Sequence, residues 1–134
     1  MEGRLKYKVE ELKDALNNFE ESLSIKLEDL SPIVTDSVKS GRVQKFEFCI
    51  ELLWNTVKVY LLEVNGIDTK GPKPAIKEFY NLGFLSAKEY EALIEAIDDR
   101  NKLSHVYKKQ QFEEIYQRVI KMLPFFRTVL KNLK

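Results

Sequence analysis

The segment from residue 98 to residue 107 carries side chains suited to proton transfer and phosphate binding. It holds the only histidine of the chain, His105, with Arg100 five residues before it and Tyr107 two residues after it. The unperturbed pKa of histidine suits proton transfer near neutral pH. Arginine stays charged and can hold a phosphate through two hydrogen bonds. The pair could cleave RNA without a metal, because His105 would move a proton at the 2′-hydroxyl or leaving oxygen while Arg100 stabilises the charged phosphorane.

The spacing of these residues limits how they can meet. On a regular α-helix, residues five apart point about 140° away from each other. Arg100 would then lie beside Ser104, and Asn101 beside His105, since residues four apart are neighbours on a helix. Arg100 and His105 can converge only if the helix loosens near Ser104 or if two subunits contribute to one site.

A simpler interpretation gives the same segment no chemistry. A histidine at the end of a helix is commonly solvated or caps the helix. Asp98, Asp99 and Arg100 would form a surface cluster of ion pairs, which contributes little to stability. Tyr107 would be an aromatic residue at the rim with its hydroxyl group in water.

The other common catalytic and metal-binding templates are missing from the sequence. It has no glycine-rich phosphate loop, no HExxH or EF-hand pattern and no GxSxG nucleophile turn. A nucleotidyltransferase would need clustered carboxylates beside a Gly-Ser loop, and the chain has no such pattern. Cys49 is the only cysteine, so neither an internal disulfide nor a zinc cluster is expected. We therefore expect no metal site and no cofactor.

Charge is balanced overall but unevenly distributed. The net charge is +1, yet residues 1–30 carry 5 basic and 8 acidic side chains, whereas residues 101–134 carry 8 basic and 2 acidic ones. The basic C-terminal quarter could follow a phosphate backbone such as that of RNA, or it could be a lysine-rich solvated helix face. No apolar run is long enough to span a membrane, and the N-terminus lacks the apolar core of a signal peptide. The expected location is the cytoplasm.

Apolar periodicity predicts an all-α protein in which residues 1–134 form one domain. Its fold class would be an up-and-down antiparallel four-helix bundle with one extra short helix. The expected long helices cover residues 4–25 and 42–64, a segment from residue 86 that fades near 104–107, and residues 110–132 with a kink at Pro124. The short helix covers residues 72–82. Residues 26–41 are expected to form a connector with at most one short helical piece.

The second predicted helix has apolar residues on two faces. Phe46, Ile50, Leu53, Val57, Tyr60 and Val64 form one stripe, and Phe48, Leu52, Val59 and Leu62 form another on roughly the opposite side. A helix that is apolar on two faces is central in its own bundle or shared with another subunit. We therefore predict a homodimer through the second helix, with the second stripe at the interface.

Three segments resemble a known family. Arg100-Asn101-x-x-Ser104-His105-x-Tyr107 resembles the R-x4-H-x-Y signature of the HEPN superfamily, and most closely its branch of nucleotidyltransferase substrate-binding proteins. Residues 44–54 are similar to the second helix of that family, and residues 74–83 are similar to its short third helix.

This resemblance implies a homodimeric helical bundle that works with a separately encoded small nucleotidyltransferase. In toxin–antitoxin members the HEPN protein is a metal-independent ribonuclease, and the nucleotidyltransferase silences it by attaching AMP to the tyrosine of the motif. Carried over by position, Arg100 and His105 would be catalytic, Asn101 and Ser104 supporting polar groups, and Tyr107 the modified residue. One alternative is a non-catalytic subunit that presents substrate to the nucleotidyltransferase. Another is an interaction module in which the Arg–His pair is structural.

Overall fold

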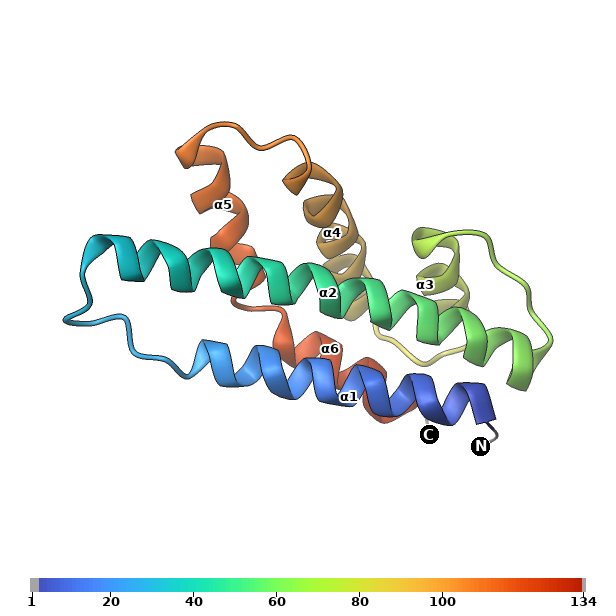
Figure 1. Ribbon diagram of the computed structural model, residues 1–134. Helices are drawn as coiled ribbons and strands as arrows, with labels where there is room; N and C mark the ends of the chain where they lie inside the picture. Colours follow the sequence, from blue (N-terminus) through green and yellow to red (C-terminus); the bar gives the residue numbers. More distant parts are fainter. Residues whose placement is uncertain (1–2, 134) are drawn as a thin grey trace.

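The computed structural model describes residues 3–133, and all of its regular structure is helical (Figure 1). This confirms the predicted all-α bundle. None of the described helices is long and apolar enough to cross a lipid bilayer. The helices in chain order are α1 (Gly3–Leu23), α2 (Pro32–Asn65), α3 (Pro72–Asn81), α4 (Ala87–Leu103), α5 (Lys109–Val119) and α6 (Leu123–Asn132).

The first two helices lie antiparallel and side by side, and the remaining helices pack along α2 (Figure 1). The inward face of α1 is an apolar stripe whose members Leu5, Val9, Leu12, Leu16 and Phe19 are buried. Apolar side chains three and four residues apart form one face of a helix, so the stripe turns toward α2 as a unit. The core is therefore built around α2.

The segment predicted as a connector is largely helical, so that prediction was wrong. Helix α2 begins at Pro32 and leaves only residues 24–31 between the first two helices. The Ser31 hydroxyl caps the new helix by accepting a hydrogen bond from the Val34 amide. Proline is tolerated in the first turn, where its missing N–H has no partner to lose. Gly41 lies inside the helix, where the absence of a side chain lowers stability but does not end the helix.

The last predicted helix is broken rather than kinked. Helix α5 ends at Val119 and α6 begins at Leu123, with Pro124 in the first turn of α6. Pro124 has no N–H to donate to the carbonyl group four residues earlier, so the helix cannot run continuously through this point. The short helix α3 and the capping box between Ser86 and Glu89 at the start of α4 agree with the prediction.

The second apolar stripe of α2 faces outward only in part. Phe48 and Leu62 are 56% and 42% exposed, whereas Val59 is 7% exposed and belongs to the core of its own chain. Leu52 is half-buried. The assignment of Val59 to a subunit interface was therefore wrong. Val64, expected to face the core, is 55% exposed because it lies at the end of α2.

Candidate functional site

The motif residues lie where α4 ends and the chain turns toward α5. Arg100 and Asn101 lie in the last turn of α4, and Ser104 is the residue that caps its C-terminal end. His105 and Tyr107 follow in the loop before α5. The His105 amide bonds to the Lys102 carbonyl at 2.8 Å, a tighter turn than that of an α-helix. Helix α4 thus ends near Ser104, the place where it would have to loosen if Arg100 and His105 were to converge.

Arg100 is turned toward α2. Its Nε atom lies 3.2 Å from Glu51 Oε2, and the side chain is 38% exposed. This Nε is buried and is not aligned for a hydrogen bond, although the charges are close enough for an ion pair. Together with Trp54 and Asn101, these side chains line a cavity of about 150 Å³ between α2 and α4.

The charge of Arg100 also affects the pKa of a second glutamate of α2, Glu47. Burial raises the pKa of the Glu47 carboxyl group above its ordinary value, and the positive charge of Arg100 partly opposes this rise. Arg100 therefore faces two acidic side chains of α2, Glu47 and Glu51. Both reduce the positive potential that it presents to an incoming phosphate.

His105 lines a different hollow, between α4 and α5, of about 480 Å³. We call it the α4–α5 hollow. Its volume lies in the range typical of small-molecule sites. Asn101 lines both this hollow and the cavity beside Arg100. The lining of the α4–α5 hollow consists of Asp98, Asn101, Lys102, His105, Val106, Gln111, Glu114, Ile115 and Arg118.

Within one chain, the structure does not bring Arg100 and His105 into one pocket. Their side chains line separate spaces on the two sides of Asn101. The expected pairing of Asn101 with His105 on a continuous helix is also absent, because His105 lies beyond the end of α4. A site that uses both side chains would therefore need a second subunit. This is the second of the two arrangements that the sequence spacing allowed.

One wall of the α4–α5 hollow carries an ion pair between the buried Asp99 and the partly exposed Arg118. Arg118 donates two hydrogen bonds of 2.8 Å to the two carboxylate oxygens of Asp99, which is 2% exposed. The hydrogen bond to Asp99 raises the pKa of the Arg118 guanidinium. Such a bidentate pair is strong and directional, so it holds α5 in one position against α4.

The interpretation of residues 98–100 as one surface cluster was wrong. Asp99 is buried against Arg118 of α5, and Asp98 pairs at 2.6 Å with Lys73 of α3. Arg100 pairs with Glu51 of α2. Successive residues of a helix point in directions about 100° apart, so these three side chains contact three different helices.

The sequence interpretation missed the contribution of α5 to the site. Gln111, Glu114 and Arg118 line the α4–α5 hollow from that helix. Their spacing of three and four residues places them on one helical face. This spacing is the feature of the sequence that could have indicated a shared site. That face is polar, however, and a polar helix face is ordinarily just solvated.

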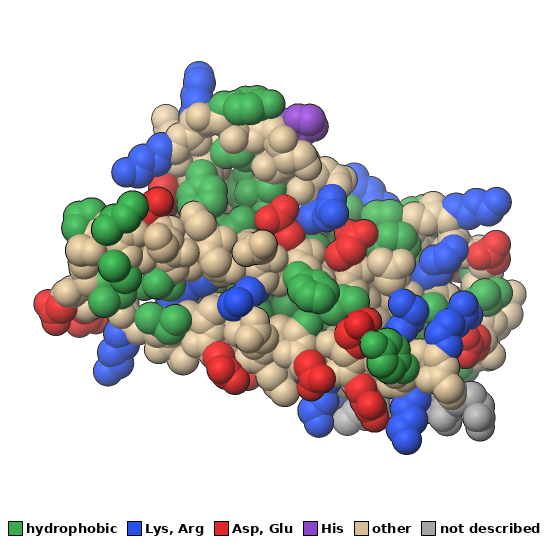
Figure 2. All heavy atoms as spheres, viewed as in Figure 1, with side chains coloured by type: hydrophobic (Ala, Val, Ile, Leu, Met, Phe, Trp, Pro, Cys, Tyr) green, Lys and Arg blue, Asp and Glu red, His purple; other side chains and the backbone are tan. Residues whose placement is uncertain are grey.

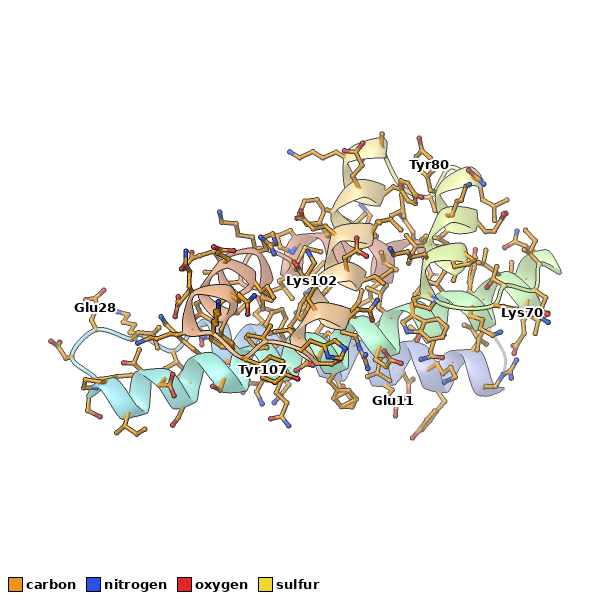
Figure 3. All side chains as sticks on the ribbon, turned by 90° about the horizontal axis from the view of Figure 1, so that it is seen from above. Glu11, Glu28, Lys70, Tyr80, Lys102 and Tyr107 are labelled. Carbon is orange, nitrogen blue, oxygen red and sulfur yellow. The ribbon has the colours of Figure 1, made fainter. Side chains whose placement is uncertain are left out.

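The loop beyond α4 is open to solvent. Tyr107 is 87% exposed, and His105, Lys108 and Lys109 are also exposed. Figure 3 shows the Tyr107 ring in this loop, above α2. A tyrosine hydroxyl in this position is accessible to a large partner molecule.

The described residues contain neither a metal-binding cluster nor an accessible thiol. No three His, Cys, Asp or Glu side chains among residues 3–133 lie close enough to hold a metal ion. Cys49 is buried, and its burial raises the thiol pKa to about 12, which keeps it protonated at neutral pH.

Comparison with known proteins gives a family match and similar solved structures, including the following two. The model of the family described as nucleotidyltransferase substrate binding protein like matches residues 7–134. A crystal structure of a Thermus thermophilus protein is 26% identical and superimposes with a TM-score of 0.80, covering 92% of this chain and 98% of that one. Among curated protein sequences, none matches this chain.

Another similar structure is from Haemophilus influenzae. It is 22% identical and has a TM-score of 0.75, covering 93% of this chain and 98% of that one. That structure is described as revealing the fold of a substrate binding domain of a nucleotidyltransferase. At this identity the likeness establishes the shared helical fold.

Proposed function

Because this chain belongs to the nucleotidyltransferase substrate binding protein like family, we propose that it is a non-catalytic substrate-binding subunit. It would hold a small polar substrate and present it to a separately encoded nucleotidyltransferase. The α4–α5 hollow of about 480 Å³ is the observation that carries this proposal. The hollow is open, is lined by hydrogen-bonding groups of both charges, and has walls locked by the Asp99–Arg118 pair.

The lining of the hollow suits a substrate with several hydrogen-bonding groups. Lys102 supplies a cation, Glu114 supplies a carboxylate, and Asn101 and Gln111 supply amides that both donate and accept. Val106 and Ile115 add a small apolar surface. Binding sites of this kind combine apolar contact with a few fixed polar groups that set the orientation of the ligand.

A transfer assay tests the proposal. A separately encoded nucleotidyltransferase from the same organism is incubated with ATP labelled at its α-phosphate and a small-molecule extract of the cells, with and without this chain. We expect the label to reach a low-mass acceptor only when this chain is present. Lys102→Ala or Gln111→Ala should lower that transfer about tenfold or more, because each removes a hydrogen bond to the substrate.

Gln117→Ala provides the matched control, because Gln117 is exposed on the same helix as Gln111 but does not line the hollow. It should leave transfer unchanged within about twofold, which is below 1 kcal/mol. Transfer to a small molecule that proceeds equally well without this chain would refute the proposal. So would equal loss in Gln111→Ala and Gln117→Ala.

The exposed loop supports a second candidate function, the ribonuclease of the HEPN toxin branch. In this interpretation Arg100 and His105 are catalytic, Asn101 and Ser104 support them, and the partner attaches AMP to Tyr107. The 87% exposure of Tyr107 is the observation that favours it. Attached AMP would add negative charge next to the loop and compete with RNA for nearby cations. Since Arg100 and His105 line separate spaces in one chain, such a site would need residues from two copies.

The same labelling experiment separates the two candidates. If the ribonuclease interpretation holds, the label appears on this protein and disappears in Tyr107→Phe. Unmodified protein should then cleave RNA in the presence of EDTA, and His105→Ala should lower that rate by about 10²–10⁴. Label on a small molecule with none on Tyr107 and no cleavage would exclude the ribonuclease interpretation.

A further inference from the structure

One end of the molecule exposes a group of large apolar side chains. It is formed by the connector between α1 and α2 and by the first turn of α2. Figure 2 shows hydrophobic side chains gathered at this end, which lies at the left in Figure 1. We call the group the connector patch. Its members are Ile25, Leu30, Ile33 and Val34, which are 47%, 36%, 70% and 45% exposed.

The connector that carries part of this patch is held in place by hydrogen bonds from α2. Arg42, which is 6% exposed, donates hydrogen bonds to the Ser22 carbonyl at 2.9 Å, the Ile25 carbonyl at 2.7 Å and the Tyr116 hydroxyl at 2.8 Å. These bonds tie the connector to α2 and α5. A contiguous apolar surface that is held in place and faces water is characteristic of an interaction site.

The charges around the connector patch indicate the kind of partner. Glu28, Asp29 and Asp36 are exposed beside it, and none of them forms an ion pair with another described residue. Lys26 is the nearest cation in the sequence. Two copies of this patch facing each other would place like charges together, which disfavours association. An apolar surface rimmed by Lys and Arg on a different protein would complement it.

The connector patch and α5, which forms one side of the α4–α5 hollow, both lie along the N-terminal half of α2. Lys39 of α2 bonds to Glu113 of α5 at 3.0 Å, and Glu114, the next residue, lines the hollow. In Figure 1, α5 lies above the N-terminal part of α2. A protein seated on the connector patch could therefore extend along α5 toward the hollow.

We propose that the connector patch is the docking site of the nucleotidyltransferase, which would contact it with an apolar surface rimmed by basic residues. This inference rests on the proposed function, since it assumes that such a partner binds. It adds the surface and the chemistry of the contact. The apolar centre provides affinity, and the acidic rim steers the basic surface of the partner toward it.

Isothermal titration of this chain with the nucleotidyltransferase used in the transfer assay tests the inference. The double variant Ile33→Ser, Val34→Ser should weaken binding about tenfold or more, the loss expected when central apolar contacts are removed. Val64→Ser is the matched control, because Val64 is 55% exposed at the other end of the same helix. Its affinity should stay within about twofold of the wild type. Circular dichroism should show unchanged helix content in all variants.

The charge argument has its own pair of variants. Glu28→Lys should slow association at low salt, whereas Glu10→Lys, an exposed change on α1, should not. Wild-type affinity in the double variant would overturn the inference and leave the proposed function standing. A wild-type chain that does not bind the nucleotidyltransferase would overturn both. A double variant that loses self-association instead would show that a second copy occupies the patch, which also overturns the inference.

Discussion

Arg100 forms an ion pair with Glu51 of α2 and acts on Glu47 through its charge, and this environment governs what that charge can do. Its Nε atom is 3.2 Å from a Glu51 oxygen, and its charge also acts on Glu47. An arginine that binds phosphate in a single subunit is usually free to offer its whole guanidinium fork. In this chain part of that fork is committed to α2. The residue is therefore well placed to connect α2 with the end of α4, and any contact to a ligand would use its remaining N–H groups.

The raised pKa of Glu47 predicts how stability changes with pH. Because burial raises the pKa of this carboxyl group in the folded state, the folded protein holds the proton to a higher pH than the unfolded chain does. Stability is therefore lost as the pH rises through this interval. Glu47→Gln removes the buried charge, so it should melt at a higher temperature than the wild type at pH 7. Below the ordinary value of 4.5 the difference should shrink.

Thermal melts at pH 7 and pH 4 measure this effect, with Glu10→Gln on the exposed face of α1 as the control. The control should change the melting temperature little at either pH. A Glu47→Gln variant less stable than the wild type at pH 7 would mean that the attraction to Arg100 outweighs the burial of the carboxylate.

Single residues show where the sequence sufficed and where it did not. The end of α4 near Ser104 agrees with the sequence prediction. Arg100 and His105 are separated as predicted, but because His105 lies beyond the helix and not because both lie on a continuous one. The partners of these residues could not be predicted. Glu51 and Arg118 reach the segment from other helices, and helical periodicity describes only the faces of one helix.

At the scale of elements, three prolines occupy the same position. Pro32, Pro72 and Pro124 all lie in the first turn of a helix. The sequence prediction was right for Pro72, where Gly71 marked a clear boundary. It placed Pro32 in the connector of residues 26–41. It treated Pro124 as a kink because the apolar periodicity of residues 110–132 continues on both sides of this proline. A proline in a helical pattern can mark a start as well as a break, and the residues before it decide between the two.

The pair between Asp99 and Arg118 predicts how α4 and α5 are held together. Arg118→Ala would leave the Asp99 carboxylate, which is 2% exposed, without its partner. The loss of a partner destabilises a buried carboxylate, and because Arg118 itself is 37% exposed we expect a decrease of about 1–3 kcal/mol in the free energy of unfolding. Denaturation in urea measures it, with Lys121→Ala, an exposed change just beyond α5, as the control.

A second variant shows whether the charge or the contact matters. Asp99→Asn in the Arg118→Ala background removes the unpaired charge and should recover part of the lost stability. If Arg118→Ala unfolds at the same urea concentration as Lys121→Ala, the pair does not hold the two helices together. The α4–α5 hollow would then have no fixed wall.

At the scale of the whole molecule, α2 divides the surface into regions with different properties. Its first turn carries the connector patch, and its flank toward α4 contacts Arg100 through Glu51. Two other residues of α2, Phe48 and Leu62, face outward. Phe48 borders a groove of about 280 Å³ against α1. The 34-residue helix carries the connector patch at its N-terminal end, whereas Phe48 and Glu51 are neighbours near its middle.

The outward residues Phe48 and Leu62 predict a symmetric dimer. Phe48 is three residues from Glu51, so the two lie on one helical face, and Glu51 pairs with Arg100. A two-fold contact through Phe48 would bring Arg100 of both chains near the interface, where His105 of a second copy could complete a site that one chain leaves divided. Phe48→Asp should convert the dimer to a monomer, because it places a charge in a self-complementary apolar contact.

Light scattering coupled to size exclusion, at micromolar protein concentration, measures the mass of each species. Tyr7→Asp on α1 is the matched control, since Tyr7 is 66% exposed and does not belong to the α2 face. It should keep twice the mass of one chain, as the wild type should. For Phe48→Asp, light scattering should give the mass of one chain, and the helix content should equal that of the wild type. A wild-type protein that is monomeric at this concentration, or a Phe48→Asp variant that stays dimeric, would contradict the dimer. Either result would leave Arg100 and His105 without a shared site.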